Sequence, residues 1–219
     1  MIARLLDLGR RPYREVWSLQ HEIHERVAAG EAPATWLVVE HDPVITLGRN
    51  GRRTNVLDPR GIEVVEVERG GDVTFHGPGQ LVVYPIMKLP RFREIVPLVR
   101  ALEETVIETL AHFGIKAHGR PEHRGVYVGD NAICAIGLAV RRMTSLHGIA
   151  LNADIPLDYD RLIRPCGMPQ FGITSISREI GRDVTWSQAR DAFLPVAARR
   201  FGLVFQRDAT PAPAGASNY

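Results

Sequence analysis

Arg69-Gly70-Gly71-Asp72-Val73-Thr74-Phe75-His76-Gly77-Pro78-Gly79-Gln80 places glycines, a cation, a hydroxyl and an imidazole directly before an apolar run. Glycine lets a backbone approach a ligand closely and adopt positive φ. Arg69, Thr74 and His76 offer donors and a titratable ring to a carbonyl or carboxylate group. The glycines alone fit a strained surface loop between two strands, but His76 and Gln80 favour a binding site. The glycine spacing and the lack of a lysine match neither a Rossmann fingerprint nor a Walker loop.

Composition predicts one globular domain over residues 1–208. The chain has 219 residues, 45% hydrophobic and 24% charged, and this length can bury a substantial core. The last segment, 209–219, is rich in Ala, Pro, Gly and polar residues and is predicted to be disordered. No apolar run reaches the roughly 18 residues of a membrane span, and the first residues contain no uninterrupted secretory apolar region. We therefore expect a cytoplasmic protein without a membrane partner.

Charge and cysteine content exclude further classes of protein. The net charge of +2 and the pI near 8.7 fall well short of a nucleic-acid-binding surface, so no nucleic-acid partner is expected. The two cysteines, Cys134 and Cys166, match neither a zinc ribbon nor a disulfide-rich secreted module. No metal site is predicted.

The periodicity of apolar residues predicts helices outside hairpins, without regular βαβ alternation or an internal repeat. Helices are expected over 12–29, 95–110 and 185–200, the last behind a capping box at Thr185–Gln188. Strands are expected at 36–40 and 44–48 around a turn, and at 63–68, 81–87, 125–128, 133–140 and 146–152. Gly129-Asp130-Asn131 indicates a hairpin turn. The predicted fold class is α+β.

Other residues that are candidates for catalysis or binding lie outside the first motif. Cys166, in Arg164-Pro165-Cys166-Gly167, is either a nucleophile or a small buried apolar residue. The nucleophilic role requires a neighbouring cation or base, because a free thiol is mostly protonated at neutral pH. An apolar strand explains Cys134 completely. His147 precedes a glycine and is either functional or a hydrogen-bonded structural histidine. His21 and His24 have the wrong spacing for a zinc protease and are assigned to a solvated helix face.

The motifs together resemble the octanoyl-[acyl-carrier-protein]:protein N-octanoyltransferases, the lipoate biosynthesis protein B family. The pattern Arg-Gly-Gly-x-x-Thr-aromatic-His-x-x-Gly-Gln-x-x-x-Tyr is met at every position from Arg69 to Tyr84, and the Pro-Cys-Gly element follows in the expected order. The resemblance covers about residues 5 to 205. It implies a mixed sheet with flanking helices, similar to the catalytic domains of biotin protein ligases and lipoate ligases.

The resemblance also implies a reaction. Cys166 would take an octanoyl group from octanoyl-acyl carrier protein as a thioester. It would then pass the group to the lysine of a lipoyl domain of a 2-oxoacid dehydrogenase, or of the glycine-cleavage H protein. No ATP, metal or other cofactor is implied, because the thioester already drives amide formation. The implied acyl pocket consists of Arg69, Gly70, Gly71, Asp72, Val73, Thr74, Phe75, His76, Ala135, Ile136, Gly137, Gly148, Ile149 and Ala150.

Ala132 departs from the family pattern. The family carries a catalytic lysine at this position, two residues before Cys134, to lower the thiol pKa and move protons. Losing such a group typically costs on the order of 10²–10⁴-fold in rate, so we expect severely reduced transfer activity. Ala132 is either an engineered substitution that traps an inactive or acyl-bound form, or a natural loss compensated by His76 or an arginine.

Two other functions are compatible with these residues. An ATP-dependent lipoate ligase of the same fold would activate a free acid as an adenylate and would need no cysteine, so the Pro-Cys-Gly element argues against it. A non-catalytic protein that binds acyl carrier protein or lipoyl domains is suggested by Ala132 alone. Acyl transfer to Cys166 would count against this binding function.

Overall fold

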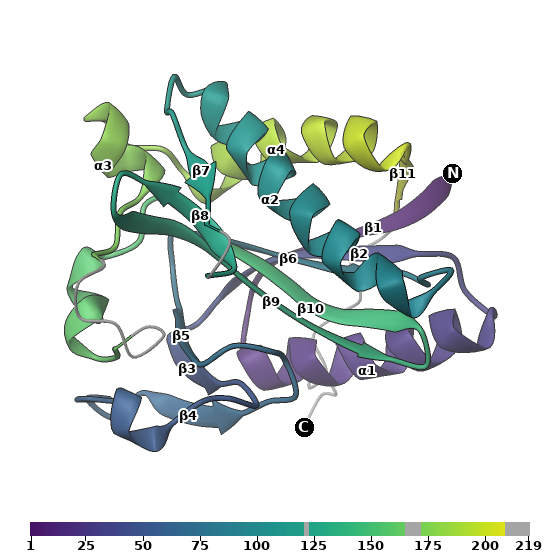
Figure 1. Ribbon diagram of the computed structural model, residues 1–219, viewed down its shortest axis with the longest axis horizontal. Helices are drawn as coiled ribbons and strands as arrows, with labels where there is room; N and C mark the ends of the chain where they lie inside the picture. Colours follow the sequence, from purple (N-terminus) through teal and green to yellow (C-terminus); the bar gives the residue numbers. More distant parts are fainter. Residues whose placement is uncertain (121–122, 165–171, 209–219) are drawn as a thin grey trace, which may run out of the picture.

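The computed structural model describes residues 1–120, 123–164 and 172–208, and its central feature is a mixed sheet (Figure 1). Among these residues the sheet has eight strands in the order β11-β1-β2-β6-β10-β9-β8-β7. β1 pairs in parallel with both β2 and β11, and the remaining neighbours are antiparallel. The strands are β1 (Ile2–Arg11), β2 (Thr35–His41), β6 (Gln80–Ile86), β7 (His118–Gly119), β8 (Gly125–Val128), β9 (Asn131–Arg141), β10 (Thr144–Asn152) and β11 (Val204–Arg207).

A second, smaller sheet lies beside the large one and carries the conspicuous sequence motif. In the described part it has the order β4-β3-β5, from β3 (Val44–Leu47), β4 (Glu63–Glu66) and β5 (Val73–His76). β3 is parallel to β4 and antiparallel to β5. The described connections contain three short 3-10 helices, η1 (Arg53–Asn55), η2 (Phe92–Glu94) and η3 (Leu157–Arg161). Residues 69–76 therefore lead from β4 into the antiparallel strand β5.

Helix α1 (Tyr13–Ala29) covers one face of the large sheet (Figure 1). Its apolar positions recur every three or four residues, and Val16, Ile23 and Val27 are buried. They pack with side chains of β1, β2 and β6, including Leu6 and Leu37. The helix ends at Gly30, whose left-handed conformation allows its N–H to reach the last carbonyls.

Helices α2 (Ile95–Ala111) and α4 (Trp186–Phe201) cover the opposite face. Leu102 of α2 and Phe193 of α4 are completely buried and share one cluster with Trp36 of β2. Thr185 caps α4, since its hydroxyl accepts from Gln188 N–H while the Gln188 side chain accepts from Thr185 N–H. The short helix α3 (Ile176–Ile180) precedes α4. In the described part, none of the helices is both long and apolar enough to cross a membrane.

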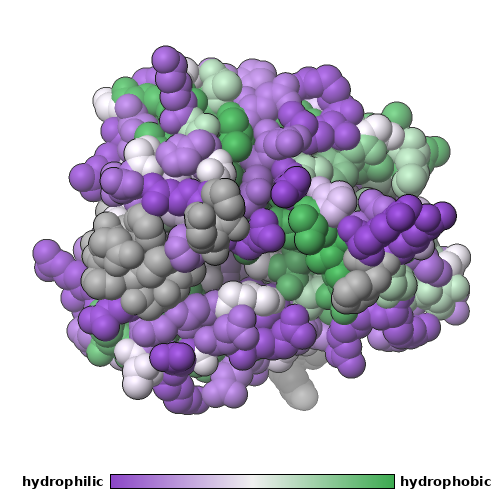
Figure 2. All heavy atoms as spheres, in the orientation of Figure 1, coloured by the Kyte–Doolittle hydropathy of each residue, from purple (hydrophilic) through white to green (hydrophobic). Residues whose placement is uncertain are grey.

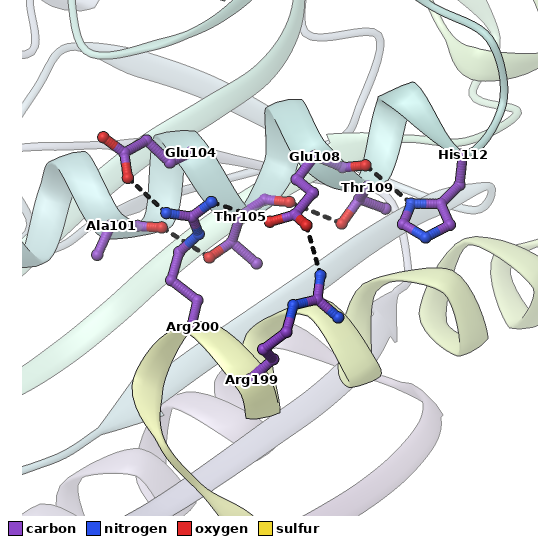
Figure 3. A network of polar contacts seen from close by, with 8 residues as sticks. All are labelled: Ala101, Glu104, Thr105, Glu108, Thr109, His112, Arg199 and Arg200. Atoms are coloured by element: carbon purple, nitrogen blue, oxygen red, sulfur yellow. Dashed lines mark hydrogen bonds and ion pairs between the residues drawn. The ribbon is translucent and has the colours of Figure 1, made fainter.

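Ion pairs join the outer surfaces of α2 and α4 (Figure 3). Arg200 contacts Glu104 at 2.6 Å and Glu108 at 2.9 Å, and Arg199 also pairs with Glu108. The two guanidinium groups lower the pKa of the Glu108 carboxyl. These side chains are partly or largely exposed to solvent, so the pairs link the two helices but add little to the free energy of unfolding.

The structure confirms the predicted α+β class and most predicted elements. α1, α2, α4, β6 and β8–β10 lie within a few residues of their predicted bounds, and Gly129-Asp130-Asn131 connects β8 and β9 as a hairpin. β1, β5, β7, β11 and α3 were not predicted. The predicted strands at 36–40 and 44–48 exist, but Pro43 separates strands of two different sheets.

The assignment of His21 and His24 to a solvated face is wrong for His24. Its side chain is 2% exposed, and its Nε2 lies 3.0 Å from the carbonyl of Arg141, the last residue of β9. His21 is partly exposed and its Nε2 lies 2.9 Å from Glu68 Oε1. The helix face is therefore an internal contact with the hairpin and with the segment after β4.

Leu102→Ala should lower the free energy of unfolding by about 2–5 kcal/mol, because it removes buried methyl groups and leaves a cavity between α2 and the sheet. Urea denaturation monitored by circular dichroism measures the change. Val96→Ala is the matched control on the same helix, since Val96 is 45% exposed. Equal losses for the two variants would contradict the packing described here.

Candidate active site

A cavity of about 450 Å³ lies between the small sheet and strands β9 and β10. Figure 2 shows hydrophobic side chains over the first half of α2 and the adjoining part of β9, surrounded by hydrophilic ones. The cavity brings together every residue of the predicted acyl pocket, namely Arg69, Gly70, Gly71, Asp72, Val73, Thr74, Phe75, His76, Ala135, Ile136, Gly137, Gly148, Ile149 and Ala150. The three predicted segments therefore form one site in space.

Arg69 is a buried cation that holds the cavity wall together. Its Nη2 donates to the carbonyl and hydroxyl oxygens of Thr46 at 2.9 and 2.8 Å, and its Nη1 donates to Gly70 O at 3.0 Å. Gly70 N–H donates to Leu138 O at 2.9 Å, which attaches the segment to β9. A Cβ at Gly137 would lie 3.0 Å from Arg69 Cδ, so glycine makes room for this side chain.

Asp72 stabilises the loop that follows β3. Its carboxylate accepts from Arg52 N–H at 3.1 Å and from the Asn55 side-chain amide at 2.5 Å, while its carbonyl accepts from Gly48 N–H at 3.0 Å. Gly71 has φ +86°, a conformation that other residues rarely adopt. Asp72 and Gly71 therefore maintain the conformation of the loop that forms this part of the cavity wall.

His76 is a buried, neutral ring in the cavity wall. Its Nδ1 donates to Gln80 Oε1 at 2.8 Å, and Nε2 lies 3.4 Å from the Thr46 hydroxyl. Burial, with the nearby His41, holds the pKa of His76 well below its usual value. The ring stacks on Tyr13 with 5.9 Å between centroids. At neutral pH this ring therefore presents no positive charge to a ligand.

Two further histidines extend this ring cluster. His41 Nδ1 donates to Arg11 O at 3.0 Å, so Nε2 accepts from the Tyr84 hydroxyl at 2.9 Å. Burial lowers the pKa of His41 to about 4 and also lowers that of His147. Three neutral imidazoles and two tyrosines thus line one side of the cavity or lie directly behind it.

His147 and Gly148 shape the floor at β10. His147 is 2% exposed with φ +58°, an unusual backbone conformation inside a strand, and its Nε2 lies 3.4 Å from Glu68 Oε1. Its N–H donates to Gln20 Oε1 at 2.9 Å. A Cβ at Gly148 would lie 2.0 Å from Val83 O, so only glycine permits this approach of β6 and β10. His147 lines the cavity and has the contacts of a structural histidine, while a functional role for it stays a prediction.

Ala132 also lines the cavity, at the start of β9. Its N–H donates to Gly172 O at 2.9 Å and its carbonyl accepts from Thr174 N–H at 3.0 Å. Lys88 instead donates from Nζ to Ala28 O at 3.1 Å. Neither Lys88 nor Lys116 is among the described residues that line the cavity, so neither takes the place of a lysine at Ala132.

Of the two cysteines, Cys134 lies within the described residues. Cys134 is buried in β9, donates from Sγ to Ala135 O at 3.5 Å, and has a pKa raised by burial, as expected for a core residue. Cys166, with Pro165 and Gly167, lies outside the described residues, as does the tail 209–219. Within the described ranges, no group of three or more His, Cys, Asp or Glu side chains is placed to hold a metal ion.

Sequence reasoning missed several cavity residues. Tyr13 begins α1, Asn152 ends β10 and Tyr159 lies in η3, and all three face the cavity. Asn152 left a weak signal, because it is a polar residue that closes an apolar strand. Tyr13 and Tyr159 left none, since their role depends on contacts between distant elements.

The fold is that of the lipoate and biotin protein ligases. A crystal structure of lipoate-protein ligase A bound with ATP is similar with a TM-score of 0.83 at 18% identity, over 96% of this chain and 90% of that one. Biotin protein ligase from Aquifex aeolicus is similar with a TM-score of 0.54 at 14% identity, over 92% and 70% of the two chains. These likenesses confirm the predicted mixed sheet with flanking helices.

Residues 12–197 match the family model of the lipoyl protein ligase A/B catalytic domain. The octanoyltransferase of Geobacter metallireducens is 44% identical over 214 residues, which cover 94% of this chain and 98% of the relative. A probable octanoyltransferase of Pyrobaculum arsenaticum is 47% identical over 81% of this chain and 82% of the relative. The chain belongs to the lipoyl protein ligase A/B catalytic domain family and, within it, to the octanoyltransferases. The predicted resemblance is confirmed.

The buried histidines predict a loss of stability in mild acid. In the unfolded chain His41 titrates near 6.5, whereas in the fold its pKa is about 4, so the unfolded state binds a proton first as the pH falls. The free energy of unfolding should therefore fall between about pH 6.5 and 4, by roughly 1–2 kcal/mol from His41 at pH 5.

Urea titrations at several pH values measure this dependence. His41→Gln should flatten the curve across this interval, because the titrating ring is removed. An equally steep curve for the variant would show that other groups cause the acid sensitivity.

Proposed function

We propose that this acyltransferase moves an octanoyl group from octanoyl-acyl carrier protein to the lysine of a lipoyl domain, through a thioester on Cys166. The observation that carries the proposal is the convergence of residues 69–76, 135–137 and 148–150 on one cavity, in a chain whose relatives are octanoyltransferases. Lipoyl domains of 2-oxoacid dehydrogenases and the glycine-cleavage H protein are the proposed acceptors, and the cytoplasm is the proposed location.

The chemistry of the cavity suits an acyl chain. Apolar side chains such as Ile136, Ile149 and Val73 line it, and removing the chain's methylene groups from water favours binding. The neighbouring imidazoles of His76 and His147 are neutral at pH 7 because burial lowers their pKa values. An apolar ligand that contacts these rings therefore does not have to remove a charged group from water.

The proposed reaction balances without an oxidant or ATP. The Cys166 thiolate attacks the thioester carbonyl, the new sulfur–acyl bond forms, and the carrier thiol leaves with a proton. The acceptor amine then attacks the acyl-enzyme carbonyl, the amide bond forms, the sulfur–acyl bond to Cys166 breaks, and a proton from the amine passes to the Cys166 sulfur. Ala132 supplies no group that moves these protons, so both steps are expected to be slow.

A lipoate ligase activity is the second candidate. It is favoured by the likeness of the fold to lipoate-protein ligase A bound with ATP, although at 18% identity this likeness shows the fold alone. The Pro165-Cys166-Gly167 sequence has no role in adenylate chemistry and favours acyl transfer. ATP-dependent attachment of free octanoate to a lipoyl domain would support the ligase.

Intact mass spectrometry after incubation with octanoyl-acyl carrier protein tests the proposal. An octanoyl adduct should form on this chain and be absent from Cys166→Ser. Ala132→Lys should raise the rate of transfer to a lipoyl domain by on the order of 10²-fold or more, because a lysine at that position would restore proton transfer.

The result that would sink the proposal is the absence of an adduct from both this chain and the Ala132→Lys variant, with both correctly folded. Normal turnover by the unchanged chain would instead overturn the expected loss of activity and leave the acyl transfer standing.

A further inference from the structure

Asn152, the last residue of β10, is a buried amide whose hydrogen-bonding groups are all engaged. Asn152 is only 4% exposed and lines the cavity. Nδ2 donates to the Tyr159 hydroxyl and to Thr174 O, each at 3.0 Å, and Oδ1 accepts from Gln80 Nε2 at 3.0 Å. An amide held by three partners, in β6, in η3 and in the segment before α3, fixes their relative positions.

The two acceptors of the Asn152 amide flank residues 165–171 in the sequence. Tyr159 comes before that segment, in η3, and Thr174 follows it. Thr174 N–H donates to Ala132 O at 3.0 Å, and Ala132 N–H donates to Gly172 O at 2.9 Å. Asn152 therefore ties both flanks of the segment that contains Cys166 to the start of β9 and the end of β10.

The orientation of Asn152 is determined by its surroundings. Thr174 O can only accept, so the NH₂ group must face it, and Oδ1 must face Gln80. Gln80 Nε2 also donates to Phe75 O at 3.3 Å, which leaves Gln80 Oε1 to accept from His76 Nδ1. The chain of amides thus connects the flanks of 165–171 to the neutral ring in the cavity wall.

We propose that Asn152 is a positioning residue for the Cys166 segment. The inference rests on the proposed function, because Asn152 holds Tyr159 and Thr174, which flank the segment that contains the proposed nucleophile, and Tyr159 and Gly172 on these flanks line the acyl cavity. Displacement of a reacting group by about 1 Å costs about 10²-fold in rate. Loss of the amide should therefore lower the rate of Cys166 acylation with little change in the KM for the donor.

Asn152→Leu is the central variant, because leucine is similar in size and makes none of the three bonds. With octanoyl-acyl carrier protein as donor, in both the unchanged and the Ala132→Lys chain, Cys166 acylation should slow by 10- to 100-fold at unchanged KM. Tyr159→Phe removes one of the three bonds and keeps the ring stacked on Phe75, so its loss should be smaller. Thr109→Val removes a buried hydroxyl of α2 that does not line the cavity, and should keep the acylation rate.

Amide hydrogen exchange supplies a readout that does not depend on acyl transfer. In Asn152→Leu the exchange rate of Thr174 N–H should rise at least tenfold, whereas Thr109→Val should leave it unchanged. Unchanged exchange, or acylation of Asn152→Leu at the rate of the unchanged chain, would overturn the inference. Absence of acylation in every chain would count against the proposed function, and the exchange result would still decide whether Asn152 fixes the flanks.

Discussion

The burial of the Arg69 guanidinium is the interaction on which the cavity depends. It anchors to Thr46 in the small sheet, while the adjacent Gly70 binds Leu138 in the large sheet. A buried cation must have its donors satisfied, since an unpaired charge inside a protein costs far more than its contacts return. The two sheets therefore meet in a fixed arrangement, and the space they leave open is the binding cavity.

The polar groups around that space form a graded environment. Near the ring cluster, burial keeps His41 and His76 uncharged, which suits an apolar ligand. Near the flanks of residues 165–171, the amides of Gln80 and Asn152 connect elements that are far apart in the sequence. The ring cluster thus leaves the cavity wall uncharged, and the amides that join it hold the described flanks of residues 165–171 in place.

The sequence predicted the helices and the long hairpin well, because each has a clear apolar period and clear end signals. It did not predict β1, in which Leu5 and Leu6 are buried on opposite faces of the sheet, so the alternation of polar and apolar residues is lost. The glycine-rich motif identified its own part of the site. Tyr13 and Tyr159 were missed since only the fold brings them to the cavity, and no local pattern records such contacts.

The place of β1 in the sheet also constrains how the chain is made. β1 pairs with β2 on one side, but its other edge is covered by β11 at residues 204–207, and Val204 N–H reaches back to Met1 O. During synthesis that edge stays unpaired until residues 204–207 have left the ribosome. An open strand edge can pair with other chains, so β1 is protected on only one edge while the residues between β2 and β11 are being synthesised.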